Sequence, residues 1–193
     1  DDFGFIHALL ERRTALRRKT AGDSIEYQMI AANVDNVIIV QSCHYDFNLK
    51  RLERYLVMVR DGGAMPCVLL TKTDLVEPAV LASQLAEIRA AGITTPVLTL
   101  SNVTRVGIDE LKRMLLPAKT YCFVGSSGVG KSTIINILIT LLARQKGTAV
   151  VAGFDVTLQP QLVRESIGIV FQDIPLDRDM TVREVLEFHG RLY

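Results

Sequence analysis

The stretch Gly125-Ser126-Ser127-Gly128-Val129-Gly130-Lys131-Ser132 lies between a short apolar run, residues 121–124, and a segment with helical periodicity, residues 133–142. It fits the pattern G-x-x-x-x-G-K-[ST], whose glycines let consecutive backbone N–H groups face phosphate oxygens. The apolar run predicts a buried strand, and the helix that follows would add its N-terminal dipole. A strand, a glycine-rich loop and a helix in this order predict a P-loop that holds the phosphates of a nucleoside triphosphate.

Individual residues of this loop have distinct predicted roles. Lys131 would neutralise the β- and γ-phosphates, and it is our first candidate for a catalytic residue. Ser132 offers a hydroxyl to Mg²⁺, and Thr133 extends the predicted nucleotide site into the helix. The cofactor that these residues predict is Mg²⁺, bound together with the nucleotide.

Upstream of the P-loop, short apolar runs alternate with amphipathic segments. These runs are residues 37–40, 67–70 and 97–100. Short runs that are apolar throughout are typical of strands buried on both faces of a parallel sheet. Helical stripes between them end at Gly62-Gly63 and at Gly92, which is placed to cap its helix, and residues 109–116 predict a third helix that Pro117 ends. The predicted fold class is therefore α/β, of the P-loop NTPase type, with a mostly parallel sheet and helices on both of its faces.

Two further loops directly follow predicted strands. Thr71-Lys72-Thr73-Asp74 comes after the second run, and an aspartate at the rim of a parallel sheet can accept hydrogen bonds from N1–H and the amino group of guanine. The stem of Lys72 would pack along the base, and a base without those donors would leave Asp74 buried and unpaired. Ser101 and Asn102 follow the third run, where GTPases place a loop that closes over the guanine edge. Taken alone, the first motif is also compatible with a solvated loop and the second with a simple turn.

The order of these motifs is unusual, because the base loop and the serine loop precede the P-loop. Together with residues 30–35 and 47–56, this order resembles the circularly permuted RsgA (YjeQ) family of ribosome small-subunit-dependent GTPases, over roughly residues 1–139. The resemblance implies GTP binding, a role in maturation of the 30S subunit and contact with that subunit or its rRNA. It also implies a preceding OB-fold domain, of which residues 1–24 would be a remnant before a GTPase-like domain at residues 25–142.

Two features of that family are missing from the expected places. No Asp-x-x-Gly follows Ser132, and no cysteine cluster accompanies the three histidines. We therefore expect impaired hydrolysis and no zinc, and we interpret His7, His44 and His189 as ordinary structural or surface residues.

The segment after the P-loop resembles a second family. Over about residues 140–193 the chain is similar to the ATP-binding domain of ABC transporters of the drug-export type, as far as the Q-loop region, so we assign residues 143–193 to an ABC ATPase-like segment. In that family Gln172 would be the Q-loop glutamine, a contact for Mg²⁺ and water and our second candidate for catalysis. Gly153, directly before Phe154-Asp155, predicts a turn between antiparallel strands rather than a Walker B strand.

Composition and charge limit the remaining classes. The chain has 193 residues, 49% hydrophobic and 22% charged, and its 22 basic and 21 acidic residues give a formal charge of +1. It can therefore bury a core, and it has no net field to attract nucleic acid or a membrane, so such a partner must contact a local patch. The basic run Arg12, Arg13, Arg17, Arg18, Lys19 is either a solvated edge or a phosphate-contacting strip beside RNA. We expect no membrane insertion and no leader, and the three widely spaced cysteines favour the reducing cytoplasm.

Three hypotheses for function remain. The first is a cytoplasmic GTP-binding P-loop protein that resembles a GTPase of 30S maturation, with the base read by Lys72 and Asp74. The second is an ATP-binding fragment of an ABC transporter, and the third is a nucleotide-binding chimera without catalysis. The guanine loop favours the first over the second, because an adenine site has no need of the Thr-Lys-x-Asp motif.

Overall fold

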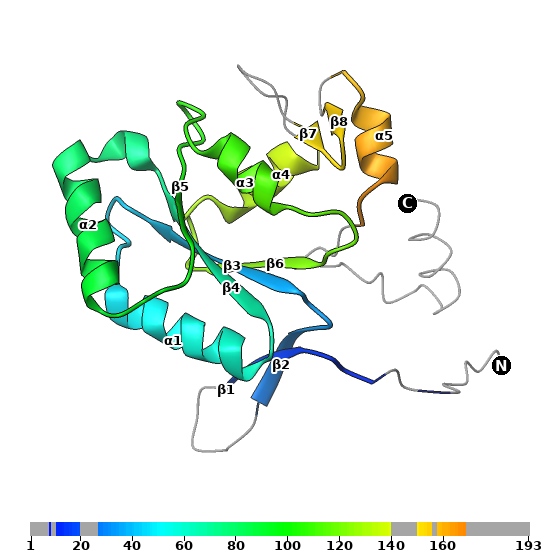
Figure 1. Cartoon of the computed structure of the whole chain (residues 1–193), viewed down its shortest axis with the longest axis horizontal. Helices are drawn as coiled ribbons and strands as arrows, with labels where there is room; N and C mark the ends of the chain where they lie inside the picture. The colour runs from blue at the N-terminus through cyan, green and yellow to red at the C-terminus, as the bar shows by residue number, and fades with distance from the viewer. Residues whose placement is uncertain (1–7, 9–10, 20–26, 140–149, 156–157, 169–193) are drawn as a thin grey trace, which may run out of the picture.

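The computed structural model of the chain describes residues 8, 11–19, 27–139, 150–155 and 158–168 (Figure 1). Its centre is a four-stranded sheet in the order β5-β4-β3-β6, in which all neighbouring strands are parallel. The strands are β3 (Asn36–Ser42), β4 (Met65–Thr71), β5 (Val97–Thr99) and β6 (Tyr121–Gly125). Each contains or overlaps one of the apolar runs, so the prediction of a parallel sheet is confirmed.

Helices cover both faces of this sheet. They are α1 (Leu49–Asp61), α2 (Pro78–Ala90), α3 (Ile108–Met114) and α4 (Lys131–Leu138). Alternate residues of β3 divide between two apolar clusters: Ile39 packs with α1 and α2, and Ile38 packs with α3 and α4. Figure 1 shows the first pair of helices on one side of the sheet and the second pair on the other. The predicted α/β fold with helices on both faces is therefore confirmed.

The ends of the helices follow local sequence signals. The Asn48 side chain caps α1 by accepting a hydrogen bond from the Arg51 backbone N–H (2.8 Å), and Gly62 is the C-terminal cap. Helix α2 begins with Pro78 and is capped by Ala91, one residue before the glycine to which the sequence assigned that role. Gly92 comes next in the left-handed region, with φ of +73°, where glycine is favoured.

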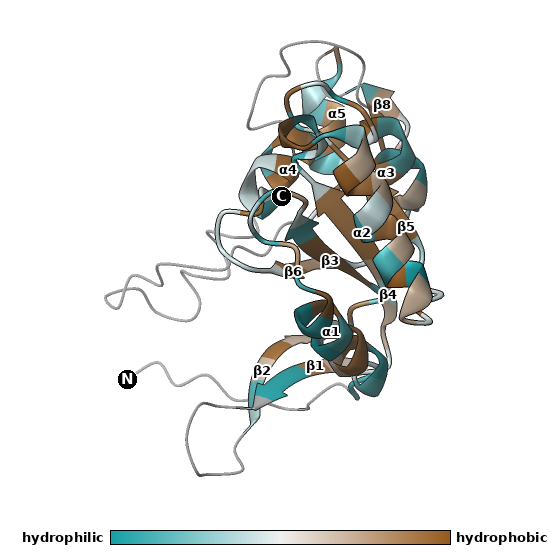
Figure 2. Ribbon diagram, turned by 90° about the vertical axis from the view of Figure 1, so that its left-hand side faces the viewer, coloured by the Kyte–Doolittle hydropathy of each residue, from teal (hydrophilic) through white to brown (hydrophobic). Residues whose placement is uncertain are grey.

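An antiparallel hairpin precedes the sheet. Strands β1 (Ala15–Lys19) and β2 (Tyr27–Ala32) pair with each other, with a bulge between Leu16 and Arg17. Leu16 is fully buried and joins the cluster under α1, and the Ala15 N–H donates to the Gly62 carbonyl (2.9 Å). Figure 2 shows the hairpin beside α1, apart from the main sheet. The sequence predicted no strand at β2, whose side chains are mostly exposed and show no apolar alternation.

The segment after α4 contributes a small hairpin and a helix. Strands β7 (Val150–Val151) and β8 (Phe154–Asp155) are antiparallel, and Gly153 between them has φ of +88°, so the predicted turn is confirmed. Helix α5 (Pro160–Glu165) follows this hairpin. His7, His189 and Gln172 lie outside the described residues, as do residues 3–7 and 9–10. Within the described parts of the chain, no helix is both long and apolar enough to cross a bilayer.

Candidate functional site

The glycine-rich loop begins where β6 meets the carboxyl end of β3. Gly125 pairs with Val40, and a Cβ on Gly125 would lie 2.2 Å from the Val40 carbonyl oxygen. Only glycine allows this approach, which turns the chain sharply from the strand into the loop. Gly130 has φ of +98° and immediately precedes α4, whose first turn has no side-chain cap. The first backbone N–H groups of α4 therefore have no capping side chain as a partner. A helix that binds an anion at its N-terminus needs these groups for the anion.

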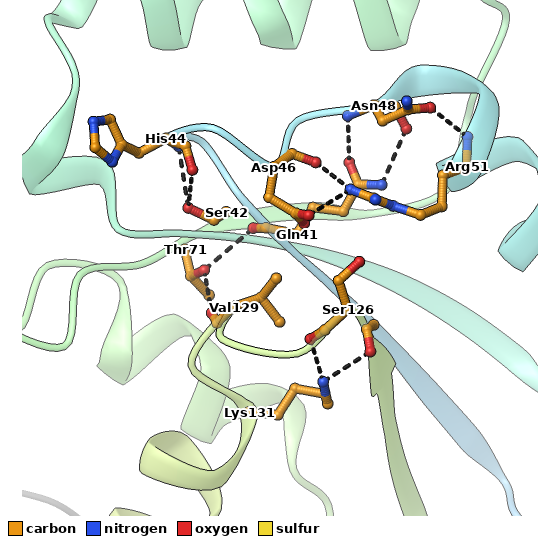
Figure 3. A network of polar contacts seen from close by, with 11 residues as sticks. Gln41, Ser42, His44, Asp46, Asn48, Arg51, Thr71, Ser126, Val129 and Lys131 are labelled. Atoms are coloured by element: carbon orange, nitrogen blue, oxygen red, sulfur yellow. Dashed lines mark hydrogen bonds and ion pairs between the residues drawn. The ribbon is translucent and has the colours of Figure 1, made fainter.

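Lys131 lies across this loop. Its Nζ donates to the carbonyl oxygens of Gly125 (2.8 Å) and Ser126 (2.5 Å), as Figure 3 shows. Burial lowers the pKa of Lys131, and the nearby carboxylate of Asp46 opposes this by raising the pKa. The ammonium group is therefore held over the loop by backbone carbonyls, where a phosphate oxygen could replace one of them.

Ser132 and Thr133 are exposed in the first turn of α4, and Ser127 and Gly128 are exposed in the loop. The described residues contain no group of three or more His, Cys, Asp or Glu side chains that could hold a metal ion by themselves. The accessible hydroxyl of Ser132 beside a phosphate site fits Mg²⁺ that is bound mainly by nucleotide oxygens and water. The described residues thus fit an ion that arrives with a nucleotide.

The base loop is attached to the P-loop. Thr71 is fully buried at the end of β4, and its hydroxyl lies 2.7 Å from the carbonyl oxygen of Val129 and 3.2 Å from that of Gln41. The next residue, Lys72, has φ of +58°, and the chain then forms the short 3-10 helix η1 (Thr73–Leu75). This turn places Asp74 at the same edge of the sheet as the P-loop.

The serine loop completes this edge. Ser101 is fully buried, and its hydroxyl donates to Asp74 Oδ1 (2.5 Å) while it accepts from the backbone N–H groups of Val103 (3.1 Å) and Thr104 (3.0 Å). The side chain of Asn102 reaches the P-loop, since its Nδ2 lies 3.2 Å from the position that a Cβ on Gly130 would occupy. The three motifs quoted from the sequence therefore lie together at one edge of the sheet. The hydrogen bond between the base loop and the P-loop joins two residues that are 58 positions apart in the sequence.

Asp74 is exposed, so the chain alone does not bury its carboxylate as the sequence predicted. The penalty for an unpaired carboxylate would arise only when a base covers it.

Sequence reasoning missed the loop between β3 and α1, residues 43–48, which lies at the same edge. Here Asp46 forms an ion pair with Arg51 (2.7 Å), whose guanidinium also donates to the Asp46 carbonyl. The Gln41 amide bonds to the backbone of Asn48 in both directions, with distances of 3.1 and 3.3 Å (Figure 3). The signal for this loop was Gln41, a buried polar residue directly after the apolar run 37–40 of β3, which runs parallel to β6.

Comparison with known proteins gives a consistent result. The sequence profile described as RsgA GTPase matches residues 9–153. The small ribosomal subunit biogenesis GTPase RsgA of Opitutus terrae is 46% identical over 136 residues, which are 70% of this chain and 36% of that protein. RsgA 2 of Lactiplantibacillus plantarum is 36% identical over 185 residues, which are 94% of this chain and 52% of that protein. The chain thus spans about a third to a half of the length of these curated relatives.

Two solved structures share the fold. The crystal structure of YjeQ from Thermotoga maritima has a TM-score of 0.59 at 23% identity and covers 77% of this chain and 51% of its own. That of YloQ, described as a circularly permuted GTPase, has a TM-score of 0.50 at 26% identity and covers 74% of this chain and 45% of its own. The chain therefore shares the fold of these solved proteins, a parallel sheet flanked by helices.

The same comparisons bear on the segment after the P-loop. The profile match continues through β7 to residue 153, and the Lactiplantibacillus alignment covers 94% of the chain. Similarity to these relatives thus continues past residue 139, the end of the resemblance that the motifs predicted. The resemblance of residues 140–193 to ABC transporters, and with it ATP as the ligand, finds no support in these comparisons.

Proposed function

Because this chain belongs to the RsgA GTPase family, we propose that it binds GTP with Mg²⁺ and acts in the cytoplasm on the maturation of the small ribosomal subunit. The observation that carries this proposal is the meeting of three motifs at one edge of the sheet. Thr71 bonds to the P-loop, and Ser101 bonds to Asp74. These contacts hold the three loops together, which supports a single site for a base and its phosphates.

In this site the phosphates would lie along Gly125 to Ser132, where Lys131 would neutralise the β- and γ-phosphates and the Ser132 hydroxyl would hold Mg²⁺. Guanine is read by Asp74, whose carboxylate accepts from N1–H and the amino group, and the stem of Lys72 packs on the base. Ser101 orients that carboxylate, and Asn102 lies between the base loop and the phosphates. Mg²⁺ supplies charge neutralisation on the phosphate oxygens.

The β1–β2 hairpin supports the ribosomal part of the proposal. The guanidinium of Arg17 lies 5.0 Å from the centroid of the Tyr27 ring, and Arg18 donates twice to the Gln28 side chain, at 3.0 and 2.8 Å. Tyr27 is 57% exposed, so the basic strip contains an aromatic ring that the sequence alone did not place there. Basic and aromatic side chains on one exposed hairpin are suited to phosphates and unstacked bases of rRNA.

We further propose that the chain hydrolyses GTP slowly. Phosphoryl transfer needs an aligned water and groups that neutralise the transition state, and no Asp-x-x-Gly follows the P-loop in this sequence. Lys131 remains for the transition state, and Gln172 is the candidate for orienting water.

The binding part of the proposal is tested by equilibrium binding of fluorescent GTP to the purified chain, with and without Mg²⁺. We expect Mg²⁺-dependent binding that is lost in Lys131→Ala and kept in Lys119→Ala, a matched lysine whose ion pair with Asp35 lies at the opposite end of β3. Equal GTP binding by the parent and Lys131→Ala would refute the proposed site.

A further inference from the structure

Tyr45 is the most exposed large hydrophobic side chain among the described residues, at 97%. It lies in the loop between β3 and α1, and its φ of +60° is in the left-handed region, where a Cβ is strained. Glycine would adopt this conformation at no steric cost. Neither the backbone nor the core therefore explains a tyrosine at this position.

The backbone beside Tyr45 is fixed by its neighbours. The Cys43 N–H donates to the carbonyl of Thr71 (2.9 Å), and Gln84 of α2 donates through Nε2 to the carbonyl of Cys43 (2.9 Å). Because the surrounding structure fixes the loop, the strained conformation persists. Strain of this kind concentrates at functional positions.

The ring of Tyr45 has an aromatic neighbour. Its centroid lies 3.7 Å from that of His44, with 49° between the ring planes. In Figure 3 the His44 side chain points away from the polar network of the loop. Two adjacent rings in a fixed and exposed loop provide π faces on which a nucleic-acid base can stack.

Charge and position indicate what occupies this surface. Lys50 and Arg54 are exposed in the first turns of α1, directly after the loop, and they can contact the phosphates beside a stacked base. The bond from Cys43 to Thr71 joins the loop to the strand that leads into Lys72 and Asp74. The surface thus combines rings with cations and borders the proposed nucleotide site.

We infer that Tyr45 and His44 form a stacking platform for an unpaired base of small-subunit rRNA. This inference rests on the proposed function, because it takes its partner from the ribosomal role. It adds a second RNA contact, on the GTPase domain and next to the nucleotide, to the one proposed for the β1–β2 hairpin.

The test compares Tyr45→Gly, Tyr45→Phe and the parent in binding to protein-free small-subunit rRNA, with the chain saturated with a non-hydrolysable GTP analogue. Loss of one base–aromatic stack should weaken rRNA binding by about fivefold or more in Tyr45→Gly, whereas Tyr45→Phe should stay within about twofold of the parent. Tyr45→Gly should also unfold at a higher temperature, because it removes the strained φ. Val57→Ala, which truncates another exposed apolar side chain, on α1, should bind rRNA as the parent does.

Several results would overturn the inference while leaving the nucleotide site intact. One is GTP binding by the parent without rRNA binding, and another is equal rRNA binding by the parent and Tyr45→Gly. A third is weakened binding of Tyr45→Gly to intact subunits but not to naked rRNA, which would make the partner a ribosomal protein. A chain that binds neither GTP nor rRNA would refute the proposed function as well.

Discussion

At the scale of single residues, we propose that Asp74 determines which base is bound. Its carboxylate is oriented by the Ser101 hydroxyl (2.5 Å), which is itself fixed by two backbone N–H groups. Asp74→Asn replaces one acceptor by an amide donor, so it should weaken GTP binding and favour xanthosine triphosphate, whose 2-oxo group can accept from that donor. Competition of both nucleotides against fluorescent GTP measures the change. Asp35→Asn, at the far end of β3, is the matched control, and an unchanged preference in Asp74→Asn would mean that this carboxylate does not contact the base.

The proposed contact with the phosphates also depends on a single residue, Lys131. Lys131→Ala removes the ammonium that two P-loop carbonyls hold in place. If the lysine and the phosphates are desolvated together, the loss should be about 2–5 kcal/mol in triphosphate binding. Titration of fluorescent GTP against the parent and the variant gives this difference.

At the scale of elements, the hydroxyl of Thr71 links β4 to the P-loop. Thr71→Val keeps the shape but leaves the buried Val129 carbonyl without this donor, which should cost about 1–3 kcal/mol. We expect lower stability in urea together with weaker GTP binding. Thr95→Val is the control, since Thr95 is also buried but bonds to Arg60. A Thr71→Val chain that binds GTP as the parent does would show that the two loops act independently.

The ion pair between Asp35 and Lys119, directly before β3, predicts that the stability of the fold depends on pH. The pKa of Asp35 is lowered by the hydrogen bond from the Thr120 N–H and by Lys119. A carboxyl whose pKa is depressed on folding stabilises the fold above its unfolded pKa, near 3.8, and loses that effect as pH falls through the lower folded value. Asp35→Asn should therefore destabilise the chain at pH 7 and progressively less below pH 3.8. Urea unfolding of both chains across this range would contradict the assignment if the difference stayed constant.

The main sheet and its helices follow from patterns in the sequence, but several contacts between elements do not. The strands of the main sheet and the helices α1 to α4 were predictable because burial on both faces of a sheet, or on one face of a helix, leaves an apolar pattern. Strand β2 leaves no such pattern, because its side chains are mostly exposed and it is held by backbone pairing with β1. The P-loop and the base loop could be found locally, but not the bond between Thr71 and Val129 or the ion pair of Asp46 and Arg51. These contacts depend on strand register and on the path of a loop, which a local pattern does not encode.

At the scale of the whole molecule, the chain combines a basic hairpin, a permuted GTPase core and a small second hairpin. We propose that this combination binds nucleotide and RNA, whereas no Asp-x-x-Gly follows the P-loop in this sequence. In single-turnover assays we expect phosphate release from GTP well below about 1 s⁻¹, the low end of ordinary enzymatic rates. The Lys131→Ala chain serves as the blank for contaminating activity. Release at or above that rate, abolished by the variant, would show that another carboxylate supports catalysis, and Asp155 and Asp173 would be the first to replace.

Our central proposal is that one edge of the sheet binds both the guanine base and the phosphates of GTP. It is tested most directly by Mg²⁺-dependent binding of fluorescent GTP to the purified chain, in competition with unlabelled GTP, GDP and ATP measured separately. We predict that GTP and GDP displace the probe and that ATP does not at comparable concentrations, since adenine offers Asp74 neither of the donors that it accepts from. Displacement by ATP as effective as that by GTP would contradict the claim.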